Sequence, residues 1–249
     1  MSARRKPVPQ GSKAQVKTAR AEREYFRSLS KVAHHIGDLI NGFPIDDPQF
    51  SSEVTTLLEQ YAQLLVPWAR FTAKRMIQEV NARDLDSWRT LGVAISQTLR
   101  NDIRNTPVGD FMRKVLDENV DLITSLPREA AQRVHKLTLE GLTDSTRAST
   151  ISKEIAASGA VSTSRALLIA RSEVSRTASV LTQARAQQVG SPGYIWETSS
   201  DAEVRPSHKA MQGQFVPWNE PPTLDKMTGH AGCFPNCRCW SCVVLAGEA

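Results

Sequence analysis

The chain has 249 residues, of which 40% are hydrophobic and 23% are charged, a balance typical of a globular protein that excludes wholesale disorder. No stretch approaches the roughly 18 consecutive apolar residues of a transmembrane helix, and residues 1–30 lack the apolar core of a secretory signal. The net charge is +5, with 31 basic and 26 acidic residues. Six basic residues and no acidic residue lie within residues 1–20, so the rest of the chain carries 25 basic and 26 acidic residues and is nearly neutral.

Residues 1–20 are predicted to form a basic, flexible arm, because Pro7, Pro9 and Gly11 interrupt them and little apolar surface is available to bury. Three roles remain open for this arm. It could bind DNA by neutralising phosphates, it could be a solvated tail, or it could become ordered over an acidic patch on a neighbouring subunit. The six basic residues are Arg4, Arg5, Lys6, Lys13, Lys17 and Arg20.

Residues 21–141 are predicted to form an all-helical domain with short loops. Apolar residues recur every three or four positions from Tyr25 to Ile40, and Asn41–Gly42 is a stop signal. Asp47 and Pro48 then begin a helix that Pro67 should kink or break.

Three more helix starts are expected in this domain. They are Asp84 as an N-cap, Thr106–Pro107, and Ser125–Pro127.

Residues 142–249 are predicted to form a small α+β domain. A short helix is expected around residues 151–157, and a longer one from Ser164 to Val189, closed by Gly190. Two β-like segments follow, at residues 194–198 and 239–245, separated by loops rich in Pro and Gly. The fold class is therefore α+β, and a C-terminal domain this small often needs a crosslink.

The four cysteines fall within ten residues near the C-terminus. Thiols this close together are more typical of a metal site in a reducing compartment than of a secreted disulfide framework, which would spread its bridges across the fold. They are Cys233, Cys237, Cys239 and Cys242.

A helical segment, ARSEVSRTASVLTQARAQQVG, leads into YIWETSSDAEVRPSHKAMQGQF and, after a Pro-rich loop, into HAGCFPNCRCWSCVV. In this order, residues 145–246 resemble the C-terminal domain of the phage Mu protein F-like family, the minor head or head-morphogenesis proteins of tailed bacteriophages. The positions that match the family's pattern are Arg171, Glu173, Trp196, Asp201, Arg205, His208, Gly213, Cys237, Arg238 and Cys239.

The resemblance implies a structural and assembly role. It implies a low-copy component inside the phage head or at its portal vertex, which associates with portal, capsid or scaffold proteins in the host cytoplasm and accompanies DNA during ejection. The arm would then contact double-stranded DNA or a neighbouring subunit, and no membrane partner is expected. Many relatives carry a further domain, sometimes an enzyme; because this chain ends at Ala249, we expect none here.

The Cys cluster and His208 predict a structural zinc, which takes four thiolate or imidazole ligands. A ligand from His208 would tie the turn after the first strand to the C-terminal strand, and such a crosslink stabilises a thin core. The preferred ligands are His208, Cys237 and Cys239, the positions that match the family's pattern. The fourth ligand is Cys233, Cys242, His230 or Asp201, in falling order of preference. The alternatives are four reduced thiols or a local disulfide such as Cys233–Cys242.

Asp201, His208 and Glu173 could in principle flank a metal-bound water, as a hydrolase requires. A closed thiolate-rich site leaves no position for that water, so we expect no enzymatic activity. Asp201 is instead expected to cap a turn before a short helix at Arg205, and Arg205 to pair with Glu173 or Asp201. The second function considered is a zinc-stabilised nucleic-acid-binding protein that is not part of a capsid, and a metal-dependent hydrolase is a remote third.

Overall fold

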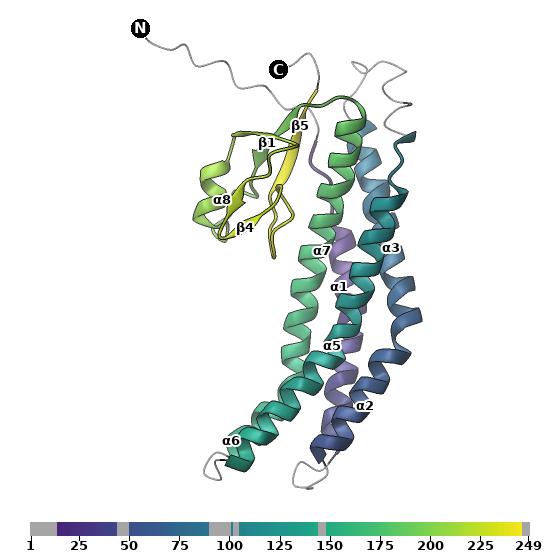
Figure 1. The fold of residues 1–249 in the computed structure, drawn as a ribbon, viewed down its shortest axis with the longest axis vertical. Coiled ribbons are helices and arrows are strands. Elements are labelled where there is room, and N and C mark those ends of the chain that lie inside the picture. Colours follow the sequence, from purple (N-terminus) through teal and green to yellow (C-terminus); the bar gives the residue numbers. More distant parts are fainter. Residues whose placement is uncertain (1–13, 44–49, 90–100, 102–104, 144–147, 246–249) are drawn as a thin grey trace. The chain divides into compact units, whose positions relative to one another are not determined.

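The computed structural model describes residues 14–43, 50–89, 101, 105–143 and 148–245. It is mostly helical with a small C-terminal strand region, which confirms the predicted α+β class (Figure 1). None of the described helices is both long enough and apolar enough to cross a membrane. The helices are α1 (Ala19–Asn41), α2 (Phe50–Leu64), α3 (Val66–Arg89), α5 (Gly109–Thr143), α6 (Ala148–Ala156), α7 (Ser158–Gln188) and α8 (Pro206–Met211). The strands are β1 (Gly193–Glu197), β2 (Phe215–Pro217), β3 (Thr223–Leu224), β4 (Met227–Thr228) and β5 (Trp240–Val244).

The chain divides into two compact units, and each is assembled from segments that lie far apart in the sequence. Among the described residues, the helical unit comprises residues 22–43, 50–76, 114–143 and 148–170, and the sheet unit comprises residues 14–21, 77–89, 101, 105–113 and 171–245. Helices α1, α3, α5 and α7 each contribute residues to both units. The domain boundary between residues 141 and 142 stays a prediction.

The first predicted helix is confirmed in the helical unit. Helix α1 ends at Asn41, and its predicted apolar stripe is largely buried, as at Leu29 and Ile36, which expose no surface. A buried polar contact joins α1 to α5, where the Tyr25 hydroxyl donates to Asn119 Oδ1 at 2.8 Å. The burial of this amphipathic face, more than local propensity, stabilises helices of this kind.

Helices α1 and α7 approach each other so closely that both need glycine at the contact. A Cβ added at Gly159 would lie 2.9 Å from the Cα of Gly37, closer than real Cβ contacts. Helix α7 begins at Ser158, six residues before the predicted start at Ser164. Its first turn contains the buried Ser158 and the close contact at Gly159, which the sequence pattern did not reveal.

We expect Gly159→Ala to destabilise the protein by about 1–3 kcal/mol, the usual cost of overpacking a tight contact. Gly109→Ala is the matched control, since a Cβ there would meet only the flexible Arg113 side chain at 3.5 Å. Urea unfolding measures both. Equal unfolding midpoints for the two variants would contradict the close helix contact.

Two predicted helix starts are wrong. Asp84 lies inside α3, where buried partners on α7 use its carboxylate, and it caps nothing. Ser125–Pro127 lies inside α5, which continues from Gly109 to Thr143 (Figure 1). Pro127 removes one backbone N–H, but residues buried on both sides of it, such as Ile123 and Ala131, stabilise the helix through their packing.

Of the other expected helix boundaries, two agree with the structure and the rest lie outside the described residues. Helix α2 ends at Leu64 and α3 begins at Val66, so the predicted break at Pro67 is confirmed. Helix α5 starts at Gly109, just after Thr106–Pro107. The Asp47 cap and residues 90–100 lie outside the described part of the chain.

The sheet unit contains a three-stranded antiparallel sheet in the order β2-β1-β5, with Tyr194 opposite Val243 and Trp196 opposite Ser241. β1 and β5 correspond to the two predicted β segments. The core of this unit is strongly aromatic, and it includes Trp88 from the last turn of α3. Its buried members are Trp88, Ala186, Tyr194, Trp196, Val216, Trp218, Ala231, Phe234, Cys237, Cys239 and Val243.

A buried ion pair fastens α3 to α7 within the sheet unit. Arg185 donates to the Asp84 carboxylate and also to Asn81 Oδ1 at 2.6 Å. The Thr182 hydroxyl donates to the other Asp84 oxygen at 2.6 Å. The side chains of Asp84 and Arg185 are 0% and 2% exposed, so each depends on the other for compensation of its charge.

Candidate metal centre

Three metal-binding side chains meet within the core of the sheet unit. His208 is on the short helix α8, and Cys237 and Cys239 are in the loop before β5. The His208 Nδ1 atom lies 3.5 Å from the Sγ atom of each cysteine. All three residues are buried, and one ligand atom from each lies within 4.8 Å of the others. The structure thus brings together the three ligands that the sequence favoured.

The local backbone explains why the two thiols point inward. Asn236 adopts a positive φ of 55°, and its N–H donates to Ser172 Oγ on α7 at 2.8 Å. Gly232 also has a positive φ, of 88°, and a Cβ there would lie 3.1 Å from Ser175 Oγ. The loop is therefore fastened against α7 by contacts that only a glycine at position 232 permits.

The cluster favours an ionised thiol. A hydrogen bond from the Cys239 thiol, helped by the backbone N–H groups of Cys239 and Gly232, lowers the pKa of Cys237 to about 5. The same thiol–thiol hydrogen bond, together with burial, raises the pKa of Cys239. Cys237 therefore gives up its proton first, and a thiolate is the form that binds metals.

The second ring nitrogen of His208 faces a carboxylate that the sequence did not single out. His208 Nε2 lies 4.0 Å from Asp225 Oδ2, and that oxygen accepts a hydrogen bond from the Ser207 hydroxyl at 2.9 Å. Asp225 and Lys226 both have positive φ, 52° and 66°, in the turn between β3 and β4. Strained backbone of this kind persists where the surrounding structure holds it, and here it presents Asp225 to the histidine.

The donor set fits zinc. Two cysteine sulfurs and one imidazole are ligands that zinc prefers, and a metal-binding histidine commonly has a carboxylate near its other nitrogen. The histidine and the thiols come from segments about thirty residues apart, so a metal held by them would crosslink α8 to the loop before β5. Edge contacts of the His208 ring with Trp196 and Phe234 continue the same core.

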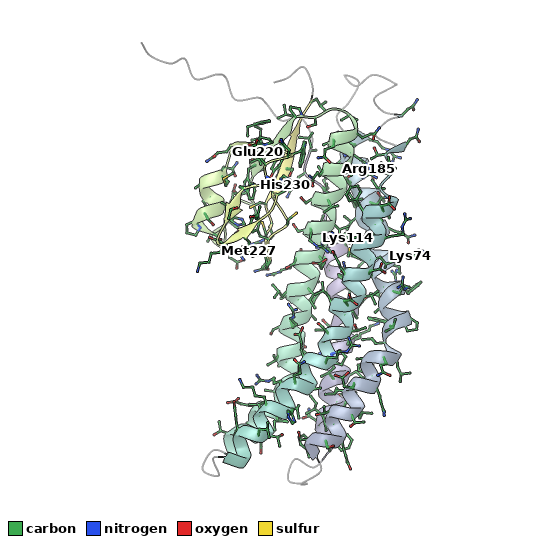
Figure 2. The ribbon with its side chains drawn as sticks, viewed as in Figure 1. Lys74, Lys114, Arg185, Glu220, Met227 and His230 are labelled. Carbon is green, nitrogen blue, oxygen red and sulfur yellow. The ribbon has the colours of Figure 1, made fainter. Side chains whose placement is uncertain are left out.

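We expect Asp225→Asn to weaken zinc binding by up to about tenfold, the lower end of the usual effect of losing an outer carboxylate, because Asp225 lies 4.0 Å from His208 Nε2, beyond hydrogen-bond distance. Glu220→Gln removes an exposed carboxylate of the same unit and is the control (Figure 2). Competition with a chromogenic chelator measures both affinities. Equal affinities in the two variants would show that Asp225 does not orient His208.

The residues considered for the fourth ligand contact groups other than His208, Cys237 and Cys239. Cys233 donates to Ser179 Oγ at 3.4 Å, and burial raises its pKa. His230 lies in the aromatic core with its Nδ1 atom 3.2 Å from the Tyr194 hydroxyl (Figure 2). Cys242 is on β5 opposite Ile195. Among the described residues none of these joins the cluster of His208, Cys237 and Cys239, and the fourth ligand stays a prediction.

Asp201 has the expected turn-capping contact and an ion pair besides. Its carboxylate accepts the N–H of Glu203 at 3.0 Å, and a hydrogen bond from Ser199 does most to lower its pKa. Arg238 lies 3.0 Å from Asp201 and 2.8 Å from Glu203. The helix expected at Arg205 is α8, which begins one residue later at Pro206.

The structure gives Arg205 a different partner from the two expected. Arg205 donates to the carbonyl of Pro235 at 2.8 Å, and Glu173 is instead paired with Arg176 at 2.8 Å. Trp196, the aromatic residue of the family's pattern, is fully buried at the centre of the sheet, where it packs in the core.

Most of the basic arm lies outside the described residues, including Arg4, Arg5, Lys6 and Lys13. Lys17 is exposed just before α1, and Arg20 is already on α1, which begins at Ala19.

The fold and this cluster define a helical protein with a small α+β unit built around a buried His–Cys–Cys group. Residues 132–242 match the family described as Phage Mu protein F like protein, which confirms the resemblance expected for residues 145–246. The chain is also 30% identical, over 154 residues, to an uncharacterized protein of Haemophilus influenzae. That similarity covers 62% of this chain and 33% of the relative, so the chain spans about a third of the relative's length. No solved structure gives a significant match.

Proposed function

We propose that this protein is a minor head protein of a tailed bacteriophage, with a structural and assembly role and no catalytic one. It acts in the virion head and, during assembly, in the host cytoplasm. The observation that carries this proposal is the family match over residues 132–242, which supports a role in phage head morphogenesis.

The chemistry of the cluster supports a structural role for the metal. His208, Cys237 and Cys239 are at most 5% exposed and belong to or contact the aromatic core of the sheet unit. A zinc on these ligands would crosslink the small core beside the sheet β2-β1-β5, as structural zinc does in small domains.

Portal, capsid or scaffold proteins are the proposed partners. Protein interfaces use large apolar side chains as anchors, and the helical unit exposes several. Leu64 is 79% exposed and Phe71 is 61% exposed. These side chains offer anchors for a neighbouring subunit in the head.

The direct test is deletion of the gene from the phage or prophage that encodes it, with complementation from a plasmid. We expect loss of infectious particles, defective heads in electron micrographs, and recovery of the complementing protein in purified heads. Normal heads and titre after deletion, with the protein found only outside heads, would refute the assembly role.

The arm is proposed to bind double-stranded DNA through its basic residues. Because α1 begins at Ala19, deletion of residues 1–18 removes five of the six basic side chains and leaves the helix intact. We expect the slope of log K against log salt to fall by about 0.9 for each phosphate that the shortened chain no longer neutralises. An unchanged slope would show that the arm does not bind DNA.

A further inference from the structure

A small polar pocket opens directly onto the proposed metal ligands. Its volume is about 60 Å³. Its lining includes His208, Cys237 and Cys239 together with Glu203, Arg205, Asn236 and Arg238. A volume of this size holds about four water-sized groups. The three ligands are thus buried in the core on one side and face a solvent-sized space on the other.

The described residues bring three ligands together, whereas zinc binds four. A site with three protein ligands and an accessible neighbouring space is the arrangement in which an external group completes the coordination. All three candidate ligands line the pocket, so a small group in the pocket would lie next to a metal that they bind.

One cation that lines the pocket, Arg205, can hold an anion there. Arg238 is neutralised by Asp201 and Glu203, at 3.0 and 2.8 Å. Arg205 bonds to a neutral carbonyl, that of Pro235, and within the described part of the chain no carboxylate lies at ion-pair distance from it. Two thiolates balance the charge of a zinc ion, and Arg205 offsets the second of the two carboxylates around Arg238. Arg205 is therefore the pocket cation that has N–H groups to offer an incoming anion.

We propose that the fourth ligand of the metal is exogenous, a small carboxylate anion that enters through this pocket and is held by Arg205. The inference rests on the metal centre proposed above. It differs from the sequence expectation, in which a cysteine, His230 or Asp201 closes the site.

The test uses the full chain loaded with Co²⁺, whose visible absorption reports the ligands, and acetate as the probe at constant ionic strength. We expect a saturable spectral change with acetate. Arg205→Gln should weaken acetate binding about tenfold, the effect of losing one charge-assisted hydrogen bond. Lys209→Gln, which removes an exposed cation on α8 that does not line the pocket, should leave acetate binding unchanged.

Cys233→Ser and Cys242→Ser complete the test. We expect both variants to keep one Co²⁺ per chain and an unchanged thiolate-to-cobalt charge-transfer band, whose intensity follows the number of bound sulfurs. A weakened band in either variant, or stoichiometric Co²⁺ with no response to acetate, overturns the exogenous ligand but leaves the metal centre standing. Failure to bind Co²⁺ at all overturns both.

Discussion

His208→Ala, or removal of the metal by a strong chelator, is expected to unfold the sheet unit. A structural zinc contributes on the order of 10 kcal/mol to a small domain, as much as the whole stability of many proteins. Without the metal, the core would contain a buried imidazole beside a thiolate, with Trp196 and Phe234 packed around them. Near-ultraviolet circular dichroism measures the loss of packing in the sheet unit directly, because the core of this unit is rich in tryptophan.

The matched control is His135→Ala, which removes an exposed histidine from helix α5 in the helical unit. This variant should keep the wild-type spectrum and its response to chelator. If His208→Ala and His135→Ala unfold at the same temperature, and the chelator changes neither the spectrum nor the midpoint of the wild type, the metal does not hold the unit together.

The second large effect is expected at the buried ion pair. Arg185→Met should cost about 3–5 kcal/mol, because it leaves the Asp84 carboxylate charged and buried without its partner. The double variant Asp84→Asn/Arg185→Met should recover part of this loss, since it removes the orphaned charge as well. Urea unfolding with tryptophan fluorescence measures all three proteins.

Arg70→Met provides the comparison, since Arg70 and Asp117 form an exposed pair at 3.4 Å whose loss should cost less than about 1 kcal/mol. Equal losses for Arg70→Met and Arg185→Met would contradict the account of the buried pair. So would a double variant that is less stable than Arg185→Met alone.

Periodicity predicted the helices well, since an apolar stripe such as that of α1 reflects burial on one face. Periodicity and boundary residues predicted the wrong helix starts where an aspartate or a proline, which often marks a helix start, lies inside a helix instead. Asp84 at the start of an apolar pattern looks like an N-cap, and nothing local reveals that Arg185, 101 residues away, uses its carboxylate. Pro127 likewise predicts a break, but the packing of α5 on both sides outweighs the lost backbone hydrogen bond.

The candidate site was predictable only where residue type and spacing in the sequence identify a ligand. His208, Cys237 and Cys239 were found because their residue types and the family's pattern both single them out. Asp225 was missed, because an aspartate in a turn is common and only the positive φ of that turn brings it near His208. The pocket arises from segments around Arg205 and Asn236 that meet only in the fold, so no spacing in the sequence indicates it.

Native mass spectrometry of the freshly purified, reduced chain tests the metal centre most directly. The account predicts one zinc per chain in the wild type, and its loss in a Cys237→Ser/Cys239→Ser variant. A wild-type chain that carries no zinc, with all four cysteines reduced or with Cys237 and Cys239 joined in a disulfide, would contradict it.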